Sequence, residues 1–145
     1  MVDVTAKPEV YREATASGTL KLRSETIELI NKGKVEKGDP FYAAKIAGVL
    51  AAKNTSSLIP LCHPLPLTDV KVDVKMVDDS SVLVEATVKT KAQTGVEMEA
   101  LVAASMALLT IWDMTKQYEK DAQGQYSHTL IQNIRVVRKV KGKGK

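Results

Sequence analysis

The sequence predicts an α+β fold, and three segments carry that prediction. Residues 70–95 alternate valines with charged residues on either side of "DDSS", which is the pattern of an antiparallel hairpin with one solvated face. Segments of helical character, 39–53 and 97–121, lie before and after this hairpin. The economical arrangement is an antiparallel sheet of about four strands with helices packed on one face, a ferredoxin-like sandwich.

The remaining elements follow from local signals. Residues up to about 18 are polar and mixed, so we expect a flexible N-terminal arm there. "GTLKLRS" alternates leucines with basic residues as a half-buried strand does, and Ser24 is a candidate N-cap for a short helix. Asp39 and Pro40 suit the start of the next helix. A final strand precedes a basic tail at about 140–145 that we expect to be disordered.

Length and composition fit one domain covering residues 1–145. The chain is 44% hydrophobic, which is enough to fill a core, and its net charge of +4 suits an anionic ligand as well as nucleic acid. A single cysteine excludes an internal disulfide and fits the cytoplasm. We find no secretory signal, and the longest apolar run is shorter than the roughly 18–20 residues that span a bilayer.

That apolar run, residues 100–112, indicates self-association. A surface helix normally shows one apolar stripe, but this segment is apolar nearly all the way round and needs cover on a second side. In a chain this small, another copy of the same chain is the expected cover. We therefore predict a homo-oligomer.

The acidic pair in "TGVEMEA" has two interpretations. Thr94 and Glu97 fit a helix capping box, and acidic side chains favour the positive end of a helix. Glu99 is not explained by capping, because the box uses only one glutamate. The pair can therefore also belong to a functional site.

The segment "WDMTK" places Asp113 and Lys116 on one helical face, with Lys120 four residues further on. The group is either an exposed ion pair or part of a polar pocket where the helix turns polar. Glu99 and Asp113 lie about 21 Å apart along one helix. A small ligand that used both would need a pocket shared between subunits.

His63 lies in "LIPLCHPLPL", where prolines stiffen the chain around it. A zinc site is disfavoured, since Cys62, His63 and the distant His128 supply few soft ligands. A Cys-His nucleophilic pair is also weak, because adjacent residues in an extended segment point to opposite faces. Two interpretations stay open: a structural histidine, or a fixed hydrogen-bond donor or proton carrier.

Several basic residues are spread along the chain. Each alone is typical of a solvated surface, but a phosphorylated substrate would explain several of them together. They are Arg12, Arg23, Lys37, Lys45, Lys53 and Lys139.

Five segments together resemble the cyclic pyranopterin monophosphate synthase family, which performs the second step of molybdenum-cofactor biosynthesis. They occur in order over nearly the whole chain: "MVDVTAK", "LRSET", "KGDPFYAAKIAGVLAAK", "LIPLCHPLPL" and "TGVEMEALVAASMALLTIWDMTK". The resemblance implies a lyase-type enzyme that converts 3',8-cyclo-7,8-dihydroguanosine triphosphate to cyclic pyranopterin monophosphate and releases pyrophosphate. Such a reaction needs proton transfers and neutralisation of a triphosphate but no redox cofactor, so we expect no cofactor and no metal site built from protein side chains.

The resemblance also implies roles for individual residues. Lys37 and Lys116 resemble the family's paired catalytic lysines, with Asp113 orienting Lys116. We expect neighbouring groups or burial to lower a lysine pKa if it is to act as acid or base. The substrate-binding residues implied are His63, Glu97, Met98 and Glu99 for the ring portions, and Arg12, Arg23, Lys53 and Lys139 for the phosphates.

The family further implies a hexamer built as a trimer of dimers, with pockets at subunit interfaces and neither nucleic acid nor membrane as partner. The alternative is a basic oligomeric module that binds a nucleotide or nucleic acid without turnover. Against that module, the chain has one Phe and one Trp and no aromatic-rich strand on which bases could stack. An inactive homologue is disfavoured by the intact set of candidate catalytic residues.

Overall fold

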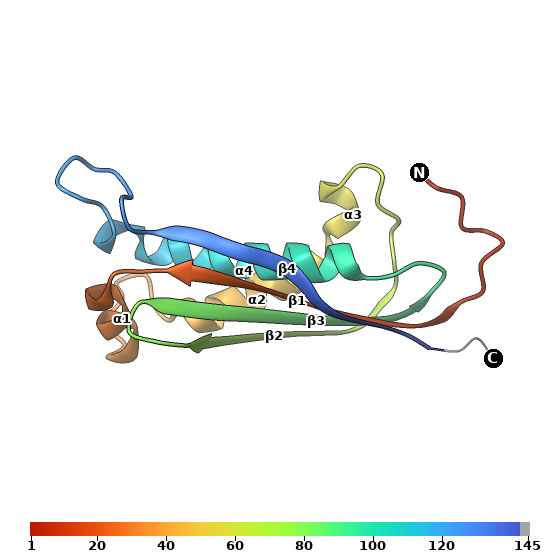
Figure 1. Ribbon diagram of the computed structural model, residues 1–145, viewed down its shortest axis with the longest axis horizontal. Helices are drawn as coiled ribbons and strands as arrows, with labels where there is room; N and C mark the ends of the chain where they lie inside the picture. Colours follow the sequence, from red (N-terminus) through yellow and green to blue (C-terminus); the bar gives the residue numbers. More distant parts are fainter. Residues whose placement is uncertain (143–145) are drawn as a thin grey trace.

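The computed structural model describes residues 1–142 and confirms the α+β prediction (Figure 1). Four antiparallel strands form one sheet in the order β2-β3-β1-β4, with helices α2 and α4 on one face. The elements are β1 (Val10–Lys21), α1 (Ser24–Asn31), α2 (Pro40–Lys53), α3 (Thr55–Leu58), β2 (Leu67–Met76), β3 (Ser81–Ala92), α4 (Glu97–Thr115), the 3₁₀ turn η1 (Lys116–Tyr118) and β4 (Leu130–Lys141).

The predicted extent of the N-terminal arm is wrong, because strand β1 begins at Val10 rather than near residue 18. β1 is a central strand that pairs with both β3 and β4. Its core-facing residues in this stretch are small, since the sheet lies close under α4: a Cβ at Gly18 would come within 2.6 Å of the Leu108 Cδ1. The missing large apolar side chains concealed the strand from the alternation test.

The helix ends differ from the predictions in two places. Asp39 caps α2 as predicted, accepting hydrogen bonds from the backbone of Phe41 and Tyr42, but α1 is preceded by Arg23 rather than capped by Ser24. α4 stops at Thr115, and η1 follows it, whereas the predicted helix continued to 121. The buried carboxylate of Glu119 ends the helical path by accepting hydrogen bonds from other segments.

The predicted basic tail overlaps β4, which continues to Lys141 opposite Arg12 of β1. Residues 143–145 of that tail lie outside the described residues. The N-terminus and the end of β4 lie at the same end of the elongated molecule (Figure 1).

Helix α4 packs closely because alanines form its inner side. Four of them, Ala100, Ala103, Ala104 and Ala107, are fully buried against the sheet and α2. With η1, the helix is long and apolar enough to cross a bilayer by length and composition, but this alanine side belongs to the protein core. Large apolar side chains remain exposed on the outer sides of the helix pair: Tyr42, Ile46 and Leu50 on α2, and Met98, Met106 and Leu109 on α4.

Gly48 lies where α2 packs tightly against β2 and α4. A Cβ there would lie 2.9 Å from Val72 Cγ2 and 3.1 Å from the Ala103 carbonyl oxygen. We expect Gly48→Val to lower the free energy of unfolding by about 1–3 kcal/mol, because the added isopropyl group has no space. Urea unfolding at fixed protein concentration measures this. Lys45→Val on the exposed side is the matched control, and equal stability of the two variants would contradict the packing argument.

Candidate active site

The carboxylate of Asp113 binds two lysines at the C-terminal end of α4. Its Oδ1 lies 2.9 Å from Lys116 Nζ, and its Oδ2 lies 3.0 Å from Lys37 Nζ. Lys37 Nζ also donates to the Asp113 backbone carbonyl at 3.0 Å. The predicted catalytic trio therefore forms one cluster, which we call the lysine centre, although Lys37 comes from the loop between α1 and α2.

The electrostatics of the lysine centre differ from the expectation for an acid-base lysine. The hydrogen bond to Asp113 raises the pKa of Lys116 above its ordinary value, where a lowered value was expected. The hydrogen bonds from Lys116 and then Lys37 lower the pKa of Asp113. Lys116 in this state is therefore a charged proton donor beside an ionised carboxylate.

Arg23 lies at this same end of the molecule, where β1 gives way to α1. Its backbone N–H donates to both carboxylate oxygens of Glu119, at 3.0 and 3.1 Å. Arg23 lines a cleft of about 390 Å³ together with Glu119 and residues of the loop before β4, including His128. That loop also carries Tyr126, whose ring meets Trp112 edge-on at 5.5 Å.

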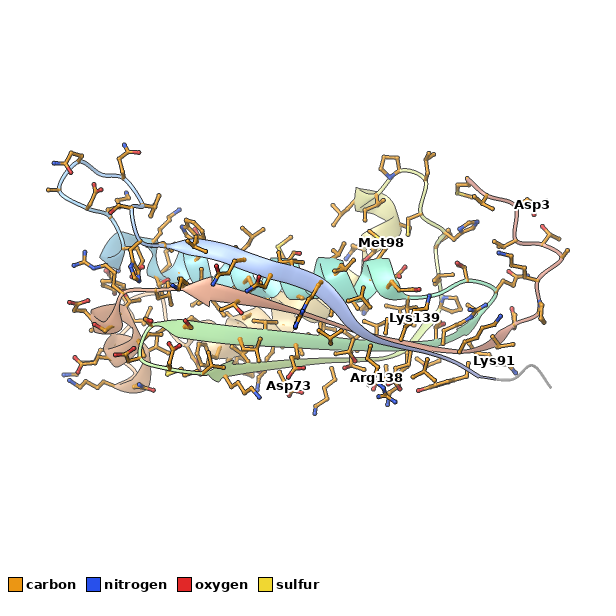
Figure 2. All side chains as sticks on the ribbon, in the orientation of Figure 1. Asp3, Asp73, Lys91, Met98, Arg138 and Lys139 are labelled. Carbon is orange, nitrogen blue, oxygen red and sulfur yellow. The ribbon has the colours of Figure 1, made fainter. Side chains whose placement is uncertain are left out.

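The other predicted site residues lie at the N-terminal end of α4, where Figure 2 shows Met98 and Lys139. Glu97 forms an ion pair with Lys139 of β4, and Arg12 of β1 donates to the Gln93 carbonyl at 3.0 Å. Three of these residues, Arg12, Glu97 and Lys139, line a cleft of about 380 Å³, here called the basic cleft. The capping-box interpretation is not supported, since the residue before α4 is Val96 and no side-chain hydrogen bond caps this helix within the described residues.

Sequence reasoning missed two members of the basic cleft, Lys7 and Lys141. Lys141 was assigned to a tail, but β4 pairs it with Arg12 and so brings it to the cleft. Correct placement of β1 and β4 as antiparallel neighbours would have supplied that signal. Lys7 belongs to the arm before β1, whose path has no periodic pattern.

Glu99 is a buried acidic residue next to this cleft. It is 3% exposed, and its Oε2 has no hydrogen-bond partner among residues 1–142. Burial raises the pKa of its carboxyl group, and the backbone hydrogen bond only partly opposes that effect. Its Oε1 lies 4.0 Å from the Cys62 sulfur, and burial raises the pKa of that thiol.

His63 does not pair with Cys62. Its Nε2 lies 2.8 Å from the carbonyl oxygen of Val2, so the N-terminal arm folds back onto the imidazole. A nucleophilic Cys-His pair is therefore not formed here. Within residues 1–142, no group of three or more His, Cys, Asp or Glu side chains could hold a metal ion.

The predicted residues thus form two groups at opposite ends of α4. The lysine centre and Arg23 lie at its C-terminal end. The basic cleft, Glu99 and Met98 lie at its N-terminal end, and Lys53 is the last, exposed residue of α2, which leads into α3 and the His63 segment. A single chain does not bring the two groups together.

The two glutamates make a pair with opposite pH responses. A carboxyl whose pKa is raised by folding destabilises the folded state as pH rises above about 4.3, the unfolded value. We expect Glu99→Gln to raise the free energy of unfolding at pH 7, with the gain vanishing near pH 4. Glu97 has the opposite shift: burial alone would raise the pKa of its carboxyl group, but the hydrogen bond from Lys139, a backbone hydrogen bond and nearby positive charges together outweigh burial, and the net pKa is lowered.

Glu97→Gln is therefore the control for Glu99→Gln. It should lower stability at pH 7, with the loss shrinking as Glu97 becomes protonated on acidification. Urea unfolding of both variants and the parent at pH 7 and pH 4 measures the two signs. A loss of stability at pH 7 in Glu99→Gln would contradict the idea that its buried charge is unfavourable.

Sequence comparison with known proteins identifies the family of this chain. The sequence model of the MoaC family matches residues 1–142. The chain is 55% identical to the "Probable cyclic pyranopterin monophosphate synthase" of Sulfurisphaera tokodaii over 97% of this chain and 93% of the relative. It is 56% identical to the protein of the same name from Thermococcus kodakarensis over 98% and 90%.

A third relative carries a slightly different name. The "Probable cyclic pyranopterin monophosphate synthase accessory protein" of Methanothermobacter thermautotrophicus is 53% identical, over 97% of this chain and 88% of the relative. The match covers both ends of α4 and therefore both groups of site residues. The chain belongs to the MoaC family.

Proposed function

We propose that this chain is a cyclic pyranopterin monophosphate synthase acting in molybdenum-cofactor biosynthesis. It would convert 3',8-cyclo-7,8-dihydroguanosine triphosphate to cyclic pyranopterin monophosphate and pyrophosphate. Family membership and the names of its relatives support the reaction class. The observation that carries the assignment within this chain is the lysine centre, in which one carboxylate holds two cationic proton donors side by side.

The lysine centre fits the proton and charge requirements of this reaction. Opening and reclosing the purine-derived ring needs proton transfers, and closure of the cyclic phosphate leaves negative charge on the departing pyrophosphate. Lys116 and Lys37 can donate protons or stabilise that charge, while Asp113 fixes their direction. The raised pKa keeps Lys116 positively charged at the start of the cycle, which favours stabilisation of negative charge as its first role.

The opposite end of α4 fits the substrate-binding role. The basic cleft has four cationic side chains, Lys7, Arg12, Lys139 and Lys141, against one carboxylate, which suits a phosphate chain. His63 and Glu99 offer hydrogen-bonding groups for the ring portion, and Glu97 and Met98 lie beside them on α4. An incoming substrate would compete with the Val2 carbonyl for His63.

Because the two groups lie at opposite ends of α4, the complete site would be formed by two subunits. We infer a homohexamer assembled as a trimer of dimers, with each pocket at an interface. The exposed apolar side chains of α2 and α4 support self-association. We place this single-domain enzyme in the cytoplasm, with a small-molecule substrate and no cofactor, nucleic acid or membrane as partner.

One observation favours a second candidate function. The four cations of the basic cleft would also suit a module that binds a nucleotide without turnover. The two functions differ at the lysine centre, because only the enzyme requires it.

The first test is turnover of the cyclised dihydro-GTP by the purified protein. We expect parent protein to release pyrophosphate and form cyclic pyranopterin monophosphate, and Lys116→Ala to lose at least about 10³-fold in kcat, as removal of a proton donor and a charge stabiliser does. Lys120→Ala is the matched control, since Lys120 is exposed beyond η1. Substrate binding without turnover by the parent would favour the binding module.

The second test concerns the shared pocket. Leu109 is 50% exposed on the outer side of α4, so Leu109→Glu should leave the chain folded while placing a charge in the inferred interface. We expect smaller particles by light scattering and a parallel loss of turnover. Lys75→Glu on the polar face of β2 serves as the control. An active monomer would overturn the shared site.

A further inference from the structure

The distance in space between Lys37 and Lys116 is set by two segments that lie far apart in the sequence. Lys116 follows α4 directly, whereas Lys37 lies in a loop between Gly33 and Gly38, whose φ angles of 64° and 107° allow sharp changes of direction. The ion pair between Lys37 and Asp113 is exposed, with 45% and 58% of the two side chains accessible. Exposed ion pairs hold geometry weakly, so the loop needs other attachments.

Two hydrogen bonds hold Glu36, the residue before Lys37. The backbone N–H of Glu36 donates to the hydroxyl of Tyr118 at 3.0 Å. The side-chain amide of Gln117 donates to Glu36 Oε2 at 3.1 Å. Both partners belong to η1, the turn that begins with Lys116 itself.

The turn η1 is anchored by the carboxylate of Glu119, the residue that follows it. This carboxylate is 1% exposed and accepts hydrogen bonds from the Arg23 backbone N–H and from the hydroxyls of Thr26 and Thr129. A buried carboxylate with several donors is costly to displace. The end of η1 is therefore tied to the end of β1, the first turn of α1 and the start of β4.

We propose that Tyr118 is a positioning residue for the reaction, with its hydroxyl holding the Lys37 loop at a fixed distance from Lys116. The contact chain runs from buried Glu119 through η1 to the Glu36 backbone and then to Lys37. In this role Tyr118 contacts neither the reacting atoms nor the substrate. It fixes the position of Lys37, which does. This inference rests on the proposed function, because it assigns Lys37 and Lys116 to the same reaction.

Tyr118→Phe tests this role with little risk to folding, since Tyr118 is half-buried and the ring remains. We expect kcat to fall about 10-fold while KM changes less than about twofold, because looser placement of Lys37 affects the transition state more than substrate binding. Tyr11→Phe is the matched control: it also removes a tyrosine hydroxyl that makes a hydrogen bond, here one donated to Glu13, and Tyr11 lies near the start of β1 rather than at the Lys37 loop. That control should keep the parental kcat.

A second measurement reads the loop without any substrate. Amide hydrogen exchange at Glu36 should speed up about fivefold in Tyr118→Phe and stay unchanged in Tyr11→Phe, because only the first removes the acceptor of that N–H. Unchanged exchange at Glu36 would overturn the contact. An equally active Tyr118→Phe beside an active parent would overturn the positioning role alone, whereas an inactive parent would refute the proposed function and this role with it.

Discussion

The close packing of α4 on the sheet is the constraint on which the rest of the structure depends. Alanines along its inner side let the helix lie close to β1, β3 and α2, and Leu108 and Ile111 of the same helix are fully buried in the core between them. The 19 residues of α4 form a rod about 28 Å long. The residues attached to its two ends are therefore held far apart, and both ends carry candidate site residues.

The two ends of α4 offer different chemical surroundings. The C-terminal end gathers cations around one shared carboxylate, with charges largely exposed. The N-terminal end combines a cationic cleft with a buried carboxyl group whose pKa is raised by burial. The proposed substrate, a ring system that carries a triphosphate chain, would use both kinds of surroundings, and the homo-oligomer proposed above would bring them together.

The sequence predicted the sheet, the hairpin and α2 because each follows a local rule. Alternating valines gave β2 and β3, and Asp39 with Pro40 gave the start of α2. The part of β1 before Gly18 was missed because its core-facing positions include the small residues Ala14 and Ala16 in place of the large apolar residues that mark a buried strand. The end of α4 was misplaced because Glu119 acts through segments more than 90 positions away, which no local pattern reveals.

The candidate site shows the same division between local and long-range information. Asp113 and Lys116 were joined by helical spacing alone, and the family resemblance added Lys37, which the structure places on the same carboxylate. Sequence reasoning alone could not find Tyr118, because its partner is a backbone N–H and any residue type at position 36 other than proline would supply that donor. Residues that position a site through backbone contacts leave no pattern of their own, so they become visible only when the segments they join are seen in place.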